Sequence, residues 1–385
     1  MKYAKRGVSS DKKEVHDAIK NIDKGLFPDA FCKILADDLT ADNDYALIMH
    51  ADTAGTKTAL AYLYWKECGD ISVWDGIVQD AIVMNLDDMA CAGAVGNYFL
   101  SSTIGRNKNL ISGDVIKRII EAGQNFACKM SDLGVELIMA GGETADVGDI
   151  VRSIDVGFTA FSRLRREDVV RIKPEHGNVI VGFESCGQAT YEEDYNSGIG
   201  SNGLTFARHE MLSKEYAAKF PETYDPLIDE QYVYSGKMKL SDPSRVDGKN
   251  IGQLLLSPTR TYLPLLIEIL KEFRNNINGI VHCTGGGQTK VLHFIDKLHV
   301  VKNNLMDIPP VFNHIQEQSN ADFYELFKVF NMGQRLEVYT DEKTANKIID
   351  IAALFQIKAQ ICGYFENSPQ KKMSIFHDEN TYLYS

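Results

Sequence analysis

Segments with strand character alternate with helical segments in both halves of the 385-residue chain, and this alternation limits the fold more than any other feature. Residues 45–51 form a short, mostly apolar run typical of a buried strand, whereas residues 113–132 carry apolar side chains at helical spacing. A polar, basic connector at residues 162–177 separates the halves. We therefore expect an α+β fold of α/β-like character with two domains, residues 1–165 and 175–385, each a small mixed β-sheet flanked by helices.

Local signals predict where several elements begin and end. A long helix is predicted at residues 74–92. A strand at residues 135–140 meets the pair Gly141-Gly142, which predicts that the strand stops there. The dipeptide Ser257-Pro258 predicts a helix start, because Ser is a good N-cap and Pro is favoured at the first helical position.

Composition excludes several classes of protein. The net charge is −12 and no basic run is present to follow a phosphate backbone, so nucleic acid is not an expected partner. No window offers about 18 uninterrupted apolar residues, so we expect no membrane span. The seven cysteines form no C-x-x-C pair, which disfavours a structural zinc site and indicates reduced thiols in a cytoplasmic protein.

The segment Asp52–Thr58 follows a predicted strand and is the first candidate for chemistry. It combines a carboxylate that could hold Mg²⁺ with Lys57, which could neutralise the charge of a polyphosphate. It is not a Walker A loop, because Thr56 rather than Gly precedes the lysine. On these residues alone, an ordinary polar turn is an equally good interpretation.

Three acids lie in the predicted helix at residues 74–92. Asp80 and Asp87 are seven positions apart and share one side of the helix, and Asp88 flanks them. Clustered carboxylates repel one another unless a cation lies among them, and a divalent metal is a natural candidate. A solvated acidic stripe is the simpler alternative and is favoured without further context.

Three glycine-rich segments could bring backbone amides close to a ligand. Gly141–Asp146 adds two acids at the end of a predicted strand, where ligands of α/β sheets often bind. Gly198–Gly203 and His282–Gly287 each precede a predicted helix. Each segment alone is a weak signal, and a single histidine such as His282 is more often a packed core residue than a base.

Taken in order, these segments resemble the phosphoribosylformylglycinamidine cyclo-ligase family, also called aminoimidazole ribonucleotide synthetase. The resemblance covers nearly the whole chain, and its L-x-P-T-R-x-Y and H-x-T-G-G-G motifs favour the cyclo-ligase branch of a wider ATP-binding superfamily. The similar segments are Arg6–Ser9, Asp52–Lys57, Asp80–Ala94, Gly141–Ala145, Ile154–Val156, Ser201–Gly203, Leu256–Tyr262, His282–Gly287 and Phe330–Gly333.

The chain also departs from the family pattern. Gly200 stands where the family has a histidine before S-N-G, and Arg335 stands where it has a glycine after F-N-M-G. In the first turn, Thr53 replaces a glycine and Ala54 replaces a valine. The acidic loop at residues 187–196 could supply a group in place of the histidine.

The resemblance implies ATP and Mg²⁺ as cofactors and formylglycinamidine ribonucleotide as the substrate. It also implies a homodimer in which the N-terminal domains pair their sheets into a barrel. ATP would phosphorylate the formyl-derived oxygen, an amidine nitrogen would attack the same carbon, and the aminoimidazole ring would close.

The resemblance further implies roles for individual residues. The catalytic candidates are Lys57, Glu143 and His282. The candidates for ATP binding are Asp52, Thr53, Gly55, Thr56, Lys57, Gly141 and Gly142. The metal candidates are Asp52, Asp80, Asp88 and Glu143, and the substrate-binding candidates are Ser201, Asn202, Gly203, Thr284, Gly285, Gly286 and Gly287.

Two alternatives remain open. One is another ATP-dependent enzyme of the superfamily, of the thiamine-monophosphate kinase, selenophosphate synthetase or hydrogenase-maturation type. Selenophosphate synthetase would require a reactive early cysteine in a glycine-rich loop, and Cys32 has no such loop around it. The other is a non-catalytic paralogue, which Gly200 and Arg335 favour and the retained acids oppose.

Overall fold

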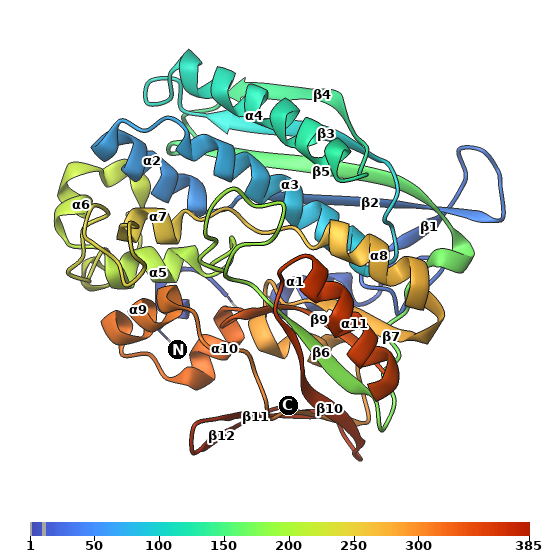
Figure 1. Ribbon diagram of the computed structural model, residues 1–385. Helices are drawn as coiled ribbons and strands as arrows, with labels where there is room; N and C mark the ends of the chain where they lie inside the picture. The colour runs from blue at the N-terminus through green and yellow to red at the C-terminus, as the bar shows by residue number, and fades with distance from the viewer. Residues whose placement is uncertain (1, 10–12) are drawn as a thin grey trace.

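The computed structural model describes residues 2–9 and 13–385 and contains two mixed β-sheets flanked by helices (Figure 1). The first sheet has five strands and the second has seven. This two-domain arrangement confirms the expected fold class. Across the described part of the chain, no helix is both long enough and apolar enough to cross a bilayer.

The first sheet has the strand order β1-β2-β5-β3-β4, and its neighbours are antiparallel except for the parallel pair β3 and β4. Helices α3 and α4 pack on one of its faces (Figure 1). The elements of this part are η1 (Ala4–Arg6), α1 (Lys13–Ile19), β1 (Ile34–Ala36), β2 (Tyr45–Thr53), α2 (Lys57–Cys68), α3 (Val73–Cys91), β3 (Tyr98–Arg106), α4 (Gly113–Asp132), β4 (Leu137–Asp146) and β5 (Ile154–Arg165).

The second sheet has the order β12-β11-β8-β10-β6-β9-β7, in which only β11 and β8 are parallel. Its elements are η2 (Arg166–Asp168), β6 (Val179–Glu184), α5 (Leu204–Met211), α6 (Glu215–Lys219), η3 (Pro221–Thr223), η4 (Glu230–Tyr232), α7 (Ile251–Leu255), α8 (Leu263–Phe273), η5 (Arg274–Asn276), β7 (Ile277–His282), η6 (Gly287–His293), β8 (Leu298–Lys302), α9 (Pro310–Ser319), α10 (Phe323–Val329), β9 (Gln334–Thr340), α11 (Glu342–Leu354), β10 (Ala359–Asn367), β11 (Lys372–His377) and β12 (Asn380–Tyr384). The domain limits at 165 and 175 stay a prediction.

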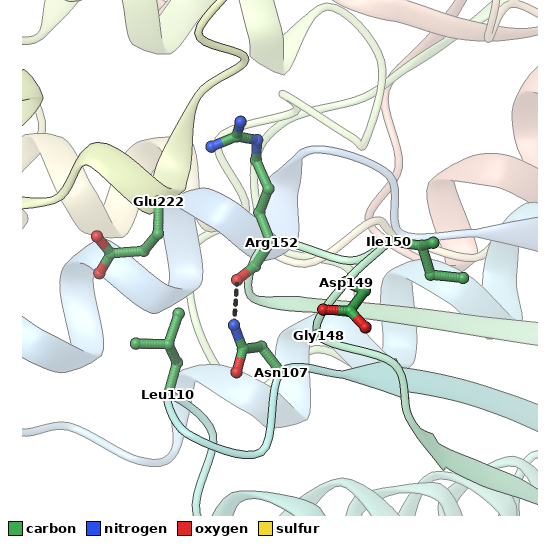
Figure 2. Close-up of a pocket in the computed structure, with 7 residues that line it drawn as sticks. All are labelled: Asn107, Leu110, Gly148, Asp149, Ile150, Arg152 and Glu222. Atoms are coloured by element: carbon green, nitrogen blue, oxygen red, sulfur yellow. Dashed lines mark hydrogen bonds between the residues drawn. The ribbon is translucent and has the colours of Figure 1, made fainter.

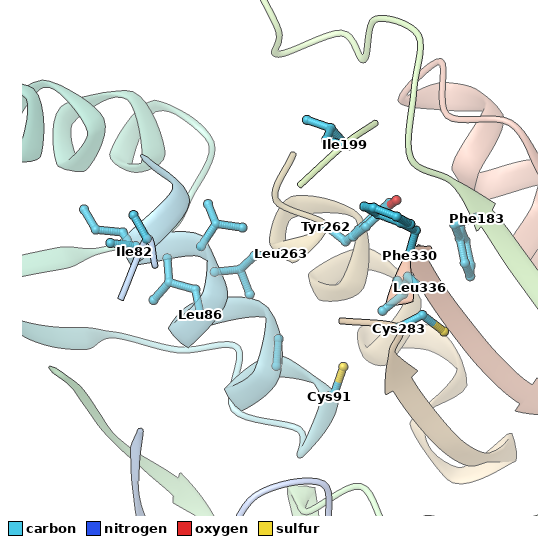
Figure 3. Close-up of a cluster of buried hydrophobic side chains, with 14 of the residues drawn as sticks. Ile82, Leu86, Cys91, Phe183, Ile199, Tyr262, Leu263, Cys283, Phe330 and Leu336 are labelled. Carbon is cyan, nitrogen blue, oxygen red and sulfur yellow. The ribbon is translucent and has the colours of Figure 1, made fainter. Parts of the chain in front are cut away.

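Helix α3 lies between the two domains (Figure 1). It packs against β2 and β5 on one side and against β7 and α8 on the other. Figure 3 shows Ile82, Leu86 and Cys91 of this helix in the same hydrophobic cluster as Tyr262 and Cys283 of the second domain. A helix that is apolar on most of its surface is stable only when it is buried all round, and α3 meets that condition.

The face of the first sheet opposite α3 and α4 is open and partly apolar. Met49, Phe161 and Phe99 lie in one cross-strand row on this face. The Met49 side chain is 58% exposed and that of Phe99 is 45% exposed. Neighbouring apolar side chains on a sheet face are normally covered, so this face is a candidate contact surface.

The prediction that a strand stops at Gly141-Gly142 is wrong. Strand β4 continues through both glycines to Asp146, because it pairs in parallel with β3 as far as Arg106. The pairing register shifts near the glycines, and a Cβ on Gly142 would lie 2.1 Å from the Ser102 hydroxyl oxygen. The glycine pair therefore allows β3 and β4 to approach closely. Glycine serves here inside a strand and does not form a turn.

The helix predicted to start at Ser257-Pro258 is also displaced. Helix α7 ends at Leu255 and α8 begins at Leu263, where Pro264 lies in the first turn. The segment between them is not helical, because its threonine hydroxyls and backbone amides are hydrogen-bonded to carboxylates of α3. Tertiary hydrogen bonds here override a local capping signal.

Candidate active site at the domain junction

The turn from Asp52 to Lys57 connects β2 to α2 and lies where the domains meet. Gly55 has a φ of 58°, and both Gly55 and Thr56 are exposed. The Thr56 hydroxyl lies 2.8 Å from the hydroxyl of Thr205, which belongs to α5 of the second domain. The N-terminus of α2 therefore lies at the junction, where the positive end of a helix dipole favours an anion, although the Thr58 and Ala59 amides already donate to the oxygens of Gly55 and Thr56.

Lys57 is fully buried at the beginning of α2. Its Nζ atom lies 2.9 Å from Asp80 Oδ1 and 2.8 Å from Asp80 Oδ2. It also donates to the backbone oxygens of Gly200 at 3.1 Å and Ser257 at 2.6 Å. Burial lowers the pKa of Lys57 below its ordinary value, although the Asp80 carboxylate opposes that effect. In this arrangement the lysine joins three chain segments and holds the Asp52–Lys57 turn against the second domain.

Each acid of α3 has its own partners in the second domain. The Asp80 carboxylate accepts hydrogen bonds from the amide and hydroxyl of Thr259 at 2.7 and 2.6 Å. The Asp87 carboxylate accepts from the Thr261 hydroxyl at 2.6 Å and the Tyr262 amide at 3.0 Å. Burial raises the pKa of Asp87, although these bonds and the charge of a nearby histidine oppose the rise.

Asp88 forms a buried pair with His282. The His282 Nδ1 atom lies 2.7 Å from Asp88 Oδ1, and the Nε2 atom of His50 lies 3.5 Å from Asp88 Oδ2. Burial raises the pKa of Asp88, but the hydrogen bond and charge of His282 and the charge of His50 bring it below its ordinary value. An ionised Asp88 can only accept, so His282 carries a proton on Nδ1. The Nε2 atom of His282 is buried and has no hydrogen-bond partner among the described residues.

The alternative that the acids of α3 form a solvated stripe is wrong. Asp80 and Asp87 are fully buried, and Asp88 is only 7% exposed. Their positions follow from the burial of α3 on both sides, which the sequence of one helix does not reveal.

The glycine-rich segments of the second domain meet one another. A Cβ on Gly285 would lie 3.8 Å from Asn202 Oδ1, and a Cβ on Gly203 would lie 2.2 Å from the Phe330 ring. The Asn331 side-chain amide donates to the Gly198 oxygen at 2.9 Å. The predicted substrate-binding residues Ser201, Asn202, Gly203, Thr284, Gly285, Gly286 and Gly287 therefore lie in two adjoining loops.

Glu143 lies apart from the other candidate metal ligands. In the sheet register it belongs to the row Thr53, Gly157, Thr103 and Glu143, whereas Asp52 is in the next row. Successive rows point to opposite faces, so Asp52 faces α3 and Glu143 faces the open side of the sheet. Three inter-strand steps, each about 4.8 Å, also separate β2 from β4.

One chain does not bring the four predicted metal ligands together. Within residues 2–9 and 13–385, no group of three or more His, Cys, Asp or Glu side chains is placed to hold a metal ion. Asp80 and Asp88 are already paired with Lys57 and His282. Gly141, Gly142 and Glu143 are exposed on β4. Metal binding by Asp52, Asp80, Asp88 and Glu143, and the ATP and catalytic roles of the other residues, stay predictions.

Two pockets differ in their relation to this junction. The pocket in Figure 2 is lined by Asn107, Leu110, Gly148, Asp149, Ile150, Arg152 and Glu222, none of which is a predicted site residue. A larger cavity of about 850 Å³ is bordered by Gln79, Asn196 and Ser257, among other residues. Because the Ser257 oxygen accepts from Lys57, this cavity lies beside the buried ion pair.

Sequence reasoning missed several residues of the junction. His50 lies in β2 two residues before Asp52, and Thr259 and Thr261 lie in the segment where a helix was expected. Every second residue of Leu-Ser-Pro-Thr-Arg-Thr-Tyr from the serine to the second threonine carries a hydroxyl group. This alternation could have predicted an extended segment whose hydroxyl groups face carboxylates. Nothing in the sequence around His50 distinguishes it from an ordinary strand residue.

Two family models together match most of the chain. Residues 31–164 match "AIR synthase related protein, N-terminal domain", and residues 175–375 match "AIR synthase related protein, C-terminal domain". The chain belongs to the AIR synthase related family. The suspected family relationship is thereby confirmed.

Curated relatives agree with this assignment. The chain is 30% identical over 324 residues to a phosphoribosylformylglycinamidine cyclo-ligase of Methanocaldococcus jannaschii, covering 83% of this chain and 78% of that protein. It is 28% identical over 355 residues to the cyclo-ligase of Syntrophus aciditrophicus, covering 88% and 85%. This family member is therefore divergent but similar over almost its full length.

Solved structures share the fold at low sequence identity. "AaThiL complexed with AMPPCP and TMP" has a TM-score of 0.55 at 11% identity and covers 97% of each chain. "T. maritima PurL complexed with FGAR" has a TM-score of 0.53 at 15% identity and covers 88% of this chain. The chain spans only 45% of that PurL chain, about half its length.

We predict that Lys57 and Asp80 stabilise the fold as a pair. Asp80→Asn or Lys57→Met should each lower the free energy of unfolding by about 3 kcal/mol or more, because the remaining charge stays buried without its partner. The double variant should lose less free energy of unfolding than the two single variants lose together, as measured by chemical denaturation. Removing the exposed Lys117–Glu121 pair is the control and should cost about 0.5 kcal/mol or less. Strict additivity of the Lys57 and Asp80 effects would contradict the prediction.

Proposed function

We propose that this protein converts formylglycinamidine ribonucleotide and ATP to aminoimidazole ribonucleotide, ADP and phosphate. The observation that carries the proposal is the similarity to named cyclo-ligases over 83% or more of the chain. The junction supports it, because an exposed helix N-terminus, a histidine with a free ring nitrogen and two glycine-rich loops lie around the contact between the domains.

The reaction needs positioning and charge neutralisation more than a nucleophilic side chain. ATP transfers its terminal phosphoryl group to the formyl-derived oxygen of the substrate, which turns a poor leaving group into phosphate. The amidine nitrogen then attacks the same carbon, phosphate leaves with that oxygen, and the nitrogen loses a proton. Because the attack is within one molecule, its orientation in the glycine-rich loops supplies much of the acceleration.

His282 is the residue we assign to the proton. Its Nδ1 atom is hydrogen-bonded to Asp88, which leaves the lone pair on the buried Nε2 atom, and we assign to that atom the acceptance of the proton released on ring closure. Asp88 orients the ring and stabilises the imidazolium that forms. Lys57 acts in this proposal by holding the turn in place, since its ammonium is already bound to Asp80.

Mg²⁺ would neutralise the phosphate charges of bound ATP. The arrangement within one chain does not form a single set of metal ligands, so we derive no step through the metal. Asp52 and Glu143 remain the acids that are accessible, and a second copy of the chain against the open sheet face would change the surroundings of Glu143.

We propose a homodimer formed through the open face of the first sheet. The apolar row of Met49, Phe161 and Phe99 supports a second copy as the occupant, because two identical apolar faces are complementary in a twofold arrangement. A cytoplasmic location and the domain limits at 165 and 175 complete the proposal.

A kinase that acts on a small phosphate ester is the second candidate. The fold shared with AaThiL over 97% of both chains is consistent with this alternative but does not favour it over the cyclo-ligase. The His282–Gly287 and Leu256–Tyr262 segments favour the cyclo-ligase, because they resemble its motifs and supply the partners of the α3 acids.

We predict turnover of formylglycinamidine ribonucleotide that depends on ATP and Mg²⁺, measured by formation of aminoimidazole ribonucleotide. Asp88→Asn should lower kcat by about 100-fold or more, because His282 loses the partner that fixes its tautomer. Glu143→Gln should abolish the metal-dependent activity. Glu136→Gln, an exposed acid just before β4, is the matched control and should leave kcat unchanged. Phosphorylation of thiamine phosphate with no ring closure would overturn the proposed function.

We predict that Met49→Asp or Phe99→Asp yields a folded monomer, because a carboxylate on each copy would be buried at the contact. Light scattering should find a dimer for the unaltered chain. Ile150→Asp is the control, since this residue is 82% exposed and lies outside the row. A monomeric wild-type protein would exclude the proposed dimer.

A further inference from the structure

The two main departures from the family pattern meet in space. Arg335 lies at the second position of β9, and Gly200 lies in the glycine-rich loop before α5. A Cβ on Gly200 would have only Arg335 atoms within 4 Å, with Nη1 at 3.6 Å and Cδ at 3.8 Å. The arginine side chain therefore lies beside the position from which the family's histidine would extend.

Arg335 is a buried cation with unused donors. Its side chain is 2% exposed, and its Nη2 atom donates to the backbone oxygen of Arg260. Its guanidinium lies 5.2 Å from the centre of the Tyr262 ring. Its Nε and Nη1 atoms have no hydrogen-bond partner among the described residues.

No carboxylate of the described residues makes a direct ion pair with this guanidinium, although the charges of Asp87 and Arg335 attract each other. The nearby Asp87 carboxylate is occupied by Thr261 and Tyr262. The 187–196 loop contains three acids, and each is paired elsewhere: Glu192 with the neighbouring Arg260 at 2.5 Å, Glu193 with Lys129 at 3.4 Å, and Asp194 with Lys249. None of these acids is paired with Arg335, and the role of that loop in place of the histidine stays a prediction.

Burying a guanidinium with two unmade hydrogen bonds is costly unless an acceptor arrives. Lys57 also donates to the oxygen of Gly200, but its charge is balanced by Asp80, so Arg335 is the cation beside this loop that keeps unused donors. A phosphate oxygen is the matching acceptor, because a guanidinium binds it with charge-assisted and often bidentate geometry.

We propose that Arg335 replaces the family's histidine beside Gly200 and binds a phosphate oxygen of a substrate. The phosphate is either that of the ribonucleotide or the terminal group of ATP. The proposal rests on the proposed function for the identity of these two ligands. In this proposal the two departures compensate for each other. The loop has glycine in place of the family's histidine, and the Arg335 side chain from β9 lies where that histidine would extend.

The test is calorimetric titration of the purified chain with AMPPCP and Mg²⁺ and, separately, with formylglycinamidine ribonucleotide. Arg335→Met should raise the Kd of one ligand at least tenfold, and the ligand affected identifies the source of the phosphate. Arg335→Lys should raise the same Kd by a smaller factor, because it keeps the charge and loses the fork. The double variant Gly200→His with Arg335→Gly, which restores the family pattern, should recover much of the affinity.

Arg208→Lys is the matched control. Arg208 is also buried, donates to a backbone oxygen and lies 5.6 Å from the centre of a tyrosine ring, but it is not beside Gly200. Its variant should change neither Kd by more than twofold. In turnover, Arg335→Lys should raise the KM of the same ligand more than it lowers kcat.

Binding and turnover separate the two proposals. Unchanged Kd values for both ligands in Arg335→Met and Arg335→Lys would overturn the role of Arg335 even if the wild type closes the ring. If Arg335→Met does not fold, Arg335→Lys and the double variant decide by the same criterion. Absence of ring closure by the wild type would overturn the proposed function, while the titrations still measure the phosphate contact.

Discussion

Three carboxylates on one buried helix determine how the two domains meet. Asp80, Asp87 and Asp88 are removed from water by the first sheet on one side of α3 and the second domain on the other. Each carboxylate must find hydrogen-bond donors there, and the donors come from Lys57, from the Thr259–Tyr262 segment and from His282. The domain contact and the candidate site are therefore one structure, because the groups that hydrogen-bond to the acids also fix the positions of the Asp52–Lys57 turn and His282.

The elements with strong local periodicity were predictable from sequence. The helix at 113–132 is confirmed by α4, and the helix at 74–92 is confirmed within one residue at each end by α3. The predictions were wrong where contacts between residues far apart in the sequence determine the secondary structure. The glycines at 141 and 142 lie inside β4 because β3 pairs alongside them, and Thr259 stays outside a helix because Asp80 binds it. The α3 acids are buried because the second domain packs against this helix. The sequence of the helix alone does not predict that contact.

Two of the departures from the family pattern, Gly200 and Arg335, lie side by side at the domain junction. Asp80, Asp88 and His282 of the junction match the pattern of the resembled family, whereas Asp87 stands where that family has an asparagine. Gly200 and Arg335 both differ from the family pattern, and they are neighbours in the structure. A small residue in the loop before α5 therefore lies beside a large cationic side chain from β9. The exchange alters the charge and the hydrogen-bond donors beside this loop.

The fate of the formyl-derived oxygen of the substrate tests directly whether the substrate is phosphorylated before the ring closes. If the junction activates the substrate by phosphorylation before ring closure, the formyl-derived oxygen must leave with phosphate. Substrate carrying ¹⁸O at that position is converted with unlabelled ATP, and the released phosphate is examined by ³¹P NMR. We expect one ¹⁸O atom in each phosphate formed. Unlabelled phosphate, with the label found in water, would contradict this expectation.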